Sequence, residues 1–207
     1  MKKTIVLGGF LSIMIAGTAW CSVSPIHFDF ESDTGGWAIP DWSLDQKDSV
    51  GKSVSISGDK FSSGASSLKL TCDFPGDYWA SATVEYAKGL DLRGYKSISA
   101  DVYLPKGVPD DLLAVKIIFT TNGLGQWIEM RDALPLKPGK WVTVKAPLEA
   151  TPGGELEHWR CRSNERCIIA QLDKIIRVAI RIEYNVNSVH AGPPYKGDVY
   201  IDNVLIE

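Results

Sequence analysis

The last eleven residues, Gly197 to Glu207, constrain the fold more than any other stretch of the chain. Their alternation of apolar and polar residues shifts phase once, at Asp202-Asn203, as happens where a β-bulge inserts one extra residue. A terminal strand is fixed only by pairing with another strand, and residues 26–31 alternate in the same way. The sequence therefore predicts that residues 26–31 pair with the last strand. The core-facing residues of that strand all carry β-branched side chains, which favour strands: Val199, Ile201, Val204 and Ile206.

The rest of the chain repeats one pattern, a short apolar segment followed by a turn rich in Gly, Pro, Asp or Asn. Only residues 152–172 could instead hold a helix or a long loop. About ten short strands with hardly any helix predict an all-β fold, a two-sheet antiparallel β-sandwich of the jelly-roll kind. We expect one domain over residues 26–207. The segments expected to form strands are 27–31, 52–57, 66–72, 79–87, 96–103, 113–120, 126–131, 140–146, 175–184 and 198–206.

Residues 1–19 form a separate segment. Two lysines precede an apolar run from Ile5 to Ala16, and small residues follow it. This order is typical of a secretory signal peptide, and the run is shorter than the roughly 20 residues that a membrane-spanning helix needs. We therefore expect cleavage near residues 19–22 and a protein that is secreted or held in the cell envelope, extracellular or periplasmic. Cys21 leaves a lipid anchor open, although Trp20 stands where the lipoprotein motif has a smaller residue.

The other cysteines have different expected roles. Cys161 and Cys167 bracket a short polar loop, so they are expected to form a local disulfide in an oxidising compartment. A metal site is the alternative; His158 is close in sequence, but no second Cys or His nearby completes a four-ligand set. Cys72 lies in an apolar segment and is expected to be a buried free thiol.

The alternation within four expected strands separates a core face from an outward face. In 176–184, for example, every second residue from Ile176 to Tyr184 is expected in the core. The outward faces of the four strands are rich in Trp, Arg, Lys and Glu. From them we assign a candidate carbohydrate-binding site to Trp79, Glu85, Lys116, Trp127, Glu129, Arg131, Arg177, Arg181 and Glu183.

Charged side chains on an outward face are often no more than a solvated surface. Trp79 and Trp127 favour a ligand, because an exposed indole leaves apolar area in water. A ring face stacks on the C–H face of a sugar while Arg, Glu and Thr bind its hydroxyls. The pattern therefore favours a polysaccharide or oligosaccharide. Four further aromatic residues fall in expected loops and could rim the site: Trp42, Tyr78, Trp159 and Tyr195. Trp37 is expected to pack beside a turn and Trp141 in the core.

Four short motifs follow one another over residues 26–207. They are Phe28-Asp-Phe-Glu31 with Gly36-Trp37, the stretch Ser63–Leu70, the stretch Leu136–Val144, and Tyr200-Ile-Asp-Asn-Val204. In this order they resemble the motifs of jelly-roll carbohydrate-binding modules with the galactose-binding-like fold, similar to modules appended to β-glucanases and mannanases. The resemblance implies a non-catalytic protein that binds a glycan on a concave sheet and that associates with glycoside hydrolases.

The resemblance also implies a structural Ca²⁺ ion near the two chain ends. The matching positions are Asp29, Glu31 and Asp202, with backbone carbonyl groups near Ser63 and Gly64. Ca²⁺ binds six to eight oxygens, and carboxylates with carbonyl groups can supply them. The alternative is that Asp29 and Glu31 face only water.

Two other function classes stay open at this point. A glycoside hydrolase or polysaccharide lyase would need paired catalytic groups, and Glu129 with Glu85 or Glu183 could supply two carboxylates. No tight acidic cluster, catalytic triad order or phosphate loop accompanies them. The second class is a secreted structural or protein-interaction β-sandwich. A formal net charge of −3 gives no reason to expect nucleic acid as a partner.

Overall fold

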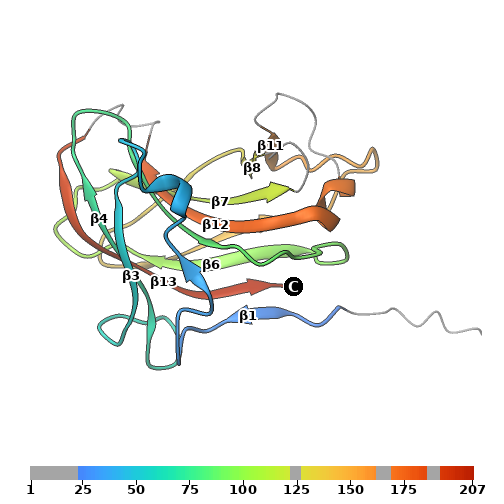
Figure 1. The fold of residues 1–207 in the computed structure, drawn as a ribbon, viewed down its shortest axis with the longest axis horizontal. Coiled ribbons are helices and arrows are strands. Elements are labelled where there is room, and N and C mark those ends of the chain that lie inside the picture. Colours follow the sequence, from blue (N-terminus) through green and yellow to red (C-terminus); the bar gives the residue numbers. More distant parts are fainter. Residues whose placement is uncertain (1–22, 122–126, 162–168, 186–191) are drawn as a thin grey trace, which may run out of the picture.

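The computed structural model describes residues 23–121, 127–161, 169–185 and 192–207. Two antiparallel sheets pack face to face, as predicted, with β7 and β12 in one layer and β6 and β13 in the other (Figure 1). The first sheet has the order β10 (Trp141–Pro147), β6 (Ser97–Tyr103), β13 (Tyr195–Ile206), β4 (Ser67–Phe74) and β3 (Gly51–Ser57), with β1 (Ile26–Phe28) on β13. The second has the order β11 (Trp159–Cys161), β8 (Trp127–Met130), β7 (Leu113–Thr121), β12 (Ile175–Tyr184), β5 (Ser81–Tyr86) and β2 (Trp37–Ala38), with β9 (Leu134–Pro135) on β7.

The two ends of the domain pair as predicted. β1 runs antiparallel to the end of β13, with Ile26 opposite Ile206 and Phe28 opposite Val204, and the two lie side by side in Figure 1. The first strand is shorter than expected and ends at Phe28, because Phe30 takes a left-handed conformation with φ of 54° and turns the chain away.

The predicted bulge in the last strand is also confirmed. Against β6, Asp202 pairs with Asp101 but Leu205 pairs with Ser99, so β13 carries one residue more than its partner. Asn203 has a φ of 50°, which allows the chain to absorb the extra residue. The bulge keeps apolar side chains facing the core on both sides of it.

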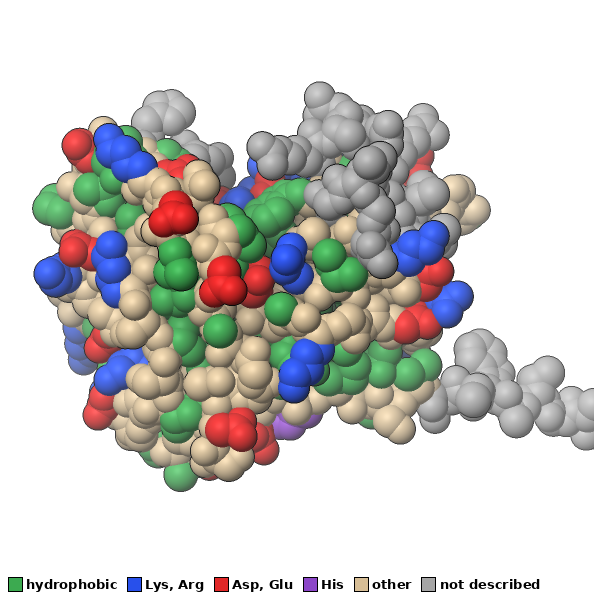
Figure 2. Space-filling view, viewed as in Figure 1, with side chains coloured by type: hydrophobic (Ala, Val, Ile, Leu, Met, Phe, Trp, Pro, Cys, Tyr) green, Lys and Arg blue, Asp and Glu red, His purple; other side chains and the backbone are tan. Residues whose placement is uncertain are grey.

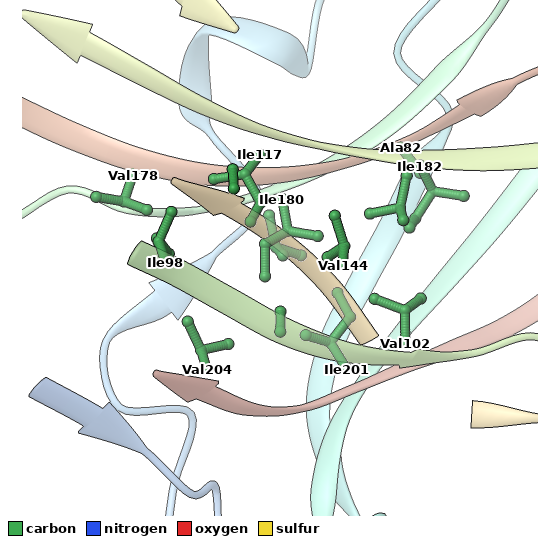
Figure 3. Close-up of a cluster of buried hydrophobic side chains, with 14 of the residues drawn as sticks. Ala82, Ile98, Val102, Ile117, Val144, Val178, Ile180, Ile182, Ile201 and Val204 are labelled. Atoms are coloured by element: carbon green, nitrogen blue, oxygen red, sulfur yellow. The ribbon is translucent and has the colours of Figure 1, made fainter. Parts of the chain in front are cut away.

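The core lies between the sheets and consists of the alternating apolar residues of both (Figure 3). Ile180 and Ile182 of β12 face Val102 and Ile201 of the other sheet, and all four are at most 1% exposed. The expected core face of β12 is wrong at one position. The register of β12 shifts between Ile175 and Arg177, so Ile175 enters the core instead of Ile176.

Three tryptophans have positions that decide between packing and a binding role. Trp37 is buried in the core, as expected. The expectation for Trp141 is wrong: it lies outside the core, on the outward face of the first sheet, with its ring 5.4 Å from that of Tyr103. The expectation of a rim position for Trp159 is also wrong, because its ring is buried and stacks on Phe119 in the core at 4.5 Å.

The segment 152–172, expected to hold a helix or a long loop, contains β11 and the start of a 3₁₀ turn, η2 (Ile169–Lys174). The short strands β2, β9 and β11 were not predicted, since two or three residues show no alternation. Within the described part of the chain, no helix is both long and apolar enough to cross a bilayer. The expected signal peptide, residues 1–19, lies outside the described residues and stays a prediction.

Truncation of a side chain at the centre of β13 tests the packing of the two sheets. We expect Ile201→Ala to lower the free energy of unfolding by about 2–5 kcal/mol, because it opens a cavity in a closed core. Leu205→Ala is the matched control, since Leu205 is only partly buried and points to the other side of the same strand. Urea unfolding measures both; equal losses for the two variants would contradict this assignment of faces.

Candidate functional site

A groove of about 700 Å³ lies on the outward face of the second sheet. Figure 2 shows the upper edge of the molecule, above β7 and β12, hollowed, with apolar and acidic side chains at the hollow. The groove gathers aromatic rings, paired charges and small polar side chains from segments that are distant in sequence. It is lined by Trp42, Gln46, Asp48, Ser49, Trp79, Ser81, Thr83, Trp127, Glu129, Arg160, Cys161 and Arg181.

One wall of the groove comes from the segment between β2 and β3. A 3₁₀ turn, η1 (Asp41–Ser43), carries Trp42, whose ring meets that of Trp127 edge to face at 6.0 Å. The segment is tied to the start of β5 by two backbone hydrogen bonds of 2.8 Å, from Val50 to Ser81 and from Ser81 to Asp48. The wall is therefore fixed to the sheet.

Glu129 is the central charge beneath the rings. Its Oε2 accepts hydrogen bonds from the Trp127 indole at 3.1 Å and from Arg181 Nη2 at 2.8 Å, and its Oε1 accepts one from Arg160 Nε at 2.6 Å. Burial would raise the pKa of Glu129, but Arg181, Trp127, Lys116 and Arg160 outweigh burial and hold the pKa below its ordinary value. Glu129 therefore stays ionised and fixed.

Lys116 and Glu183 complete this buried charge cluster, which we define as Lys116, Glu129, Arg181 and Glu183. The Lys116 ammonium lies 3.7 Å from a carboxylate oxygen of each glutamate, and Arg181 Nη2 lies 2.6 Å from Glu183 Oε2. The four side chains are at most 11% exposed. Two cations and two anions thus neutralise one another almost out of water, which is how buried charges are tolerated.

Glu85 forms a second charge pair on β5. Its carboxylate lies 3.3 Å from Arg177 Nε and accepts a hydrogen bond of 3.2 Å from the indole of Trp42. Burial raises the pKa of Glu85 above its ordinary value, although the hydrogen bond from Trp42 and the charge of Arg177 oppose the shift. Glu85 holds the Trp42 wall in place rather than lining the groove.

The nine residues assigned from sequence divide into three groups. Trp79, Trp127, Glu129 and Arg181 line the groove, as assigned. Four others lie on the same face but are packed beneath or beside the groove: Glu85, Lys116, Arg177 and Glu183. Arg131 is not brought to the groove; it lies past the end of β8, and its Nε donates to the carbonyl group of Glu157.

Trp42, expected at the rim, does line the groove, whereas Tyr78 and Tyr195, also expected there, do not. Four residues that were not expected also line it: Arg160, Gln46, Asp48 and Ser49. The only signal for Arg160 is its position beside an expected loop cysteine. Cys161 is nearly buried on β11, and Cys167 lies outside the described residues, so the expected disulfide stays a prediction. Cys72 is a buried free thiol, as expected, and burial raises its pKa to about 12.

Two of the three residues expected to hold Ca²⁺, Asp202 and Glu31, contact the loop between β3 and β4. Asp202 is fully buried, and its Oδ2 accepts hydrogen bonds from the backbone amides of Ser62 at 2.8 Å and Ser63 at 3.1 Å. Glu31 accepts hydrogen bonds from the amides of Ala65 and Ser66, while Asp29 is exposed.

In this arrangement the two carboxylates anchor the loop through N–H donors, which would compete with a cation for the same oxygens. Within the described residues, no three acidic, His or Cys side chains gather into a metal-binding group. A Ca²⁺ ion would need oxygen ligands at positions where amide N–H groups now face these two carboxylates. The calcium site itself stays a prediction from the resemblance.

Comparisons with known proteins agree on the fold. No protein-family model matches the chain, and no curated protein has a significant sequence match. A solved structure on the promiscuous specificity of carbohydrate-binding modules from the β-sandwich superfamily matches at 15% identity and a TM-score of 0.57. The match covers 87% of this chain and 61% of that one, so this chain spans less than two thirds of that neighbour's length.

Two further structures are similar over most of both chains. One is the family 11 carbohydrate-binding module of a cellulosomal cellulase of Clostridium thermocellum, at 14% identity and a TM-score of 0.50, covering 89% of this chain and 94% of that chain. The other is a family 28 module specific for non-crystalline cellulose, at 18% identity and a TM-score of 0.50, covering 86% and 92%. The chain therefore has the jelly-roll β-sandwich fold of these modules, as the sequence motifs predicted.

Removal of the charge on Asp202 tests the anchoring of the loop. We expect Asp202→Asn to lower the free energy of unfolding by about 2 kcal/mol, because a buried carboxylate accepts several hydrogen bonds there. Asp29→Asn, at an exposed carboxylate, should change stability by less than about 0.5 kcal/mol. Thermal unfolding with added Ca²⁺ or a chelator checks the calcium prediction, which requires a rise in melting temperature that Asp202→Asn abolishes.

The pH dependence of stability tests the buried charge cluster. Because the pKa of Glu129 is lowered in the folded protein, its stabilisation is complete above the ordinary value of 4.5 and is lost as the pH falls through the folded pKa. We expect Glu129→Gln to cost about 3 kcal/mol at neutral pH, and the difference from wild type to shrink at acid pH. Urea unfolding at a series of pH values from neutral to acid measures the difference in free energy of unfolding between the variant and wild type. Glu149→Gln, at an exposed carboxylate, is the control. A difference that grows towards acid pH would contradict a lowered pKa for Glu129.

Proposed function

We propose that the protein is a non-catalytic carbohydrate-binding module that holds a polysaccharide or oligosaccharide in the groove of the second sheet. The observation that carries the proposal is the grouping of Trp42, Trp79 and Trp127 around one groove. Indole rings stack on the C–H faces of sugars, and this grouping in a groove is otherwise costly for a soluble surface. The three β-sandwich neighbours, described as carbohydrate-binding modules, support the proposal.

The polar groups of the groove suit a ligand that carries hydroxyls. Ser81 and Thr83 of β5, Gln46 and Asp48 of the wall, and the partly exposed guanidinium of Arg160 all line it. These side chains supply both donors and acceptors. Since the buried charges beneath them are paired, recognition depends on hydrogen bonds and stacking more than on net charge.

Catalysis by Glu129 together with Glu85 or Glu183 has little physical support. Glu129 and Glu85 lie on strands three apart, about 14 Å across the sheet, which is more than the roughly 5–9.5 Å that glycoside hydrolysis needs. Glu129 and Glu183 are closer, but both are held by Arg181 and Lys116. Glu129, whose pKa is held below its ordinary value, stays ionised and cannot serve as the general acid.

The cellular setting is part of the same proposal. The expected signal peptide favours an exported protein, and Cys21 leaves a lipid anchor open as one form of attachment. In that setting a disulfide between Cys161 and Cys167 would link β11, which carries Arg160, to Cys167. A binding module without its own catalytic groups would act beside glycoside hydrolases that cleave the bound glycan.

Affinity electrophoresis in gels that contain β-glucan, mannan or xylan tests the proposal. We expect retardation in at least one polysaccharide, and we expect Trp79→Ala and Trp127→Ala each to weaken it about tenfold or more, because each removes a stacking face. Trp141→Ala is the matched control, since Trp141 lies on the outward face of the other sheet.

No retardation in any polysaccharide, or retardation that neither groove variant changes, would contradict the proposal. Release of reducing sugar from the same polysaccharides would instead identify a hydrolase. Capture of a protein partner that the groove variants abolish would identify an interaction module.

A further inference from the structure

Arg181 lies between the two tryptophans of the groove floor. Its Cζ atom is 5.7 Å from the ring centroid of Trp79 and 5.7 Å from that of Trp127. Both distances fall within the roughly 6 Å at which a cation is attracted to an aromatic ring. Trp79 precedes β5 and Trp127 begins β8, and these strands are not neighbours in the sheet. One side chain of β12 therefore connects two rings that the sheet itself does not bring together.

The guanidinium is itself held from below. Its Nη2 atom lies 2.8 Å from Glu129 Oε2 and 2.6 Å from Glu183 Oε2, and the side chain is 11% exposed. The Trp127 indole donates to the same Glu129 oxygen, so ring and guanidinium share an anchor. Arg181 Nε is buried without a hydrogen-bond acceptor in the described part of the chain. Little of the guanidinium is thus available to a ligand.

We infer that Arg181 is a positioning residue, which fixes the spacing of Trp79 and Trp127 so that the groove presents a preformed pair of rings. The two ring centroids can be no further apart than twice the distance from Arg181 to either of them. When the rings are already fixed, binding of the ligand does not lose the conformational entropy of ordering them, and the affinity is higher for that reason. The role requires the planar guanidinium, because a lysine ammonium would keep the charge but not the flat contact with both rings.

The contribution of Arg181 to glycan affinity rests on the proposed function. Its effect on the positions of the Trp79 and Trp127 rings does not. Fluorine NMR of protein labelled with fluorotryptophan reports each ring separately, and Trp79→Phe and Trp127→Phe assign the two signals. We expect Arg181→Lys to shift or broaden the signals of Trp79 and Trp127 and to leave that of buried Trp37 unchanged. Affinity for the retained polysaccharide should fall about tenfold.

Arg93→Lys is the matched control for the ring signals. Arg93 is exposed and ion-paired to Asp91 away from the groove, so this variant should leave the Trp79 and Trp127 signals in place. If Arg181→Lys does not fold, Arg181→Met combined with Glu183→Gln removes one charge of each sign and carries the same expectation.

Unmoved Trp79 and Trp127 signals in a folded Arg181 variant would overturn the inference. If the signals stay in place but affinity falls, Arg181 touches the ligand itself. If the signals stay in place and affinity does not fall, other contacts hold the rings. If wild-type protein binds no polysaccharide, the proposed function fails, but displaced ring signals in the variant still support the positioning role.

Discussion

The arrangement of the groove depends on the pairing of charges beneath it. Lys116, Glu129, Arg181 and Glu183 come from three neighbouring strands and are almost removed from water. An unpaired charge at this depth would cost several kcal/mol, so each of the four requires the others. Once paired, they provide a rigid base on which the indoles of Trp79 and Trp127 can lie. The positions of the two aromatic rings therefore depend on the paired charges beneath them.

The opposite sheet supplies the frame. β13 is its central strand, pairing with β4 and β6, and its end also binds β1. The bulge beside Asp202 keeps apolar residues on the core side while its carboxylate anchors the loop between β3 and β4. The two functions are separated, because one sheet closes the chain and the other carries the groove.

Several elements could be predicted because the information is local. Alternation fixed the core faces of β5, β7 and β13, and the phase slip located the bulge. The alternation of Val142 and Val144 is a local signal for an outward Trp141, but Trp141 was expected in the core. No local pattern could place Trp159, since its strand has three residues, and no alternation revealed the register shift that replaces Ile176 with Ile175.

The sequence by itself determined which side chains leave the core, since a strand period of two is a property of the backbone. It thus identified an outward face that carries Trp79, Trp127, Glu129 and Arg181. Only the tertiary structure decided that two strands between β5 and β8 bring these residues into one groove, that Trp42 closes its wall, and that Lys116 and Glu183 are covered rather than solvated. Strand order, register and burial arise from contacts between segments that are distant in sequence. The free energy of placing a charged side chain at a given position depends on that burial and on the charges that the register brings beside it.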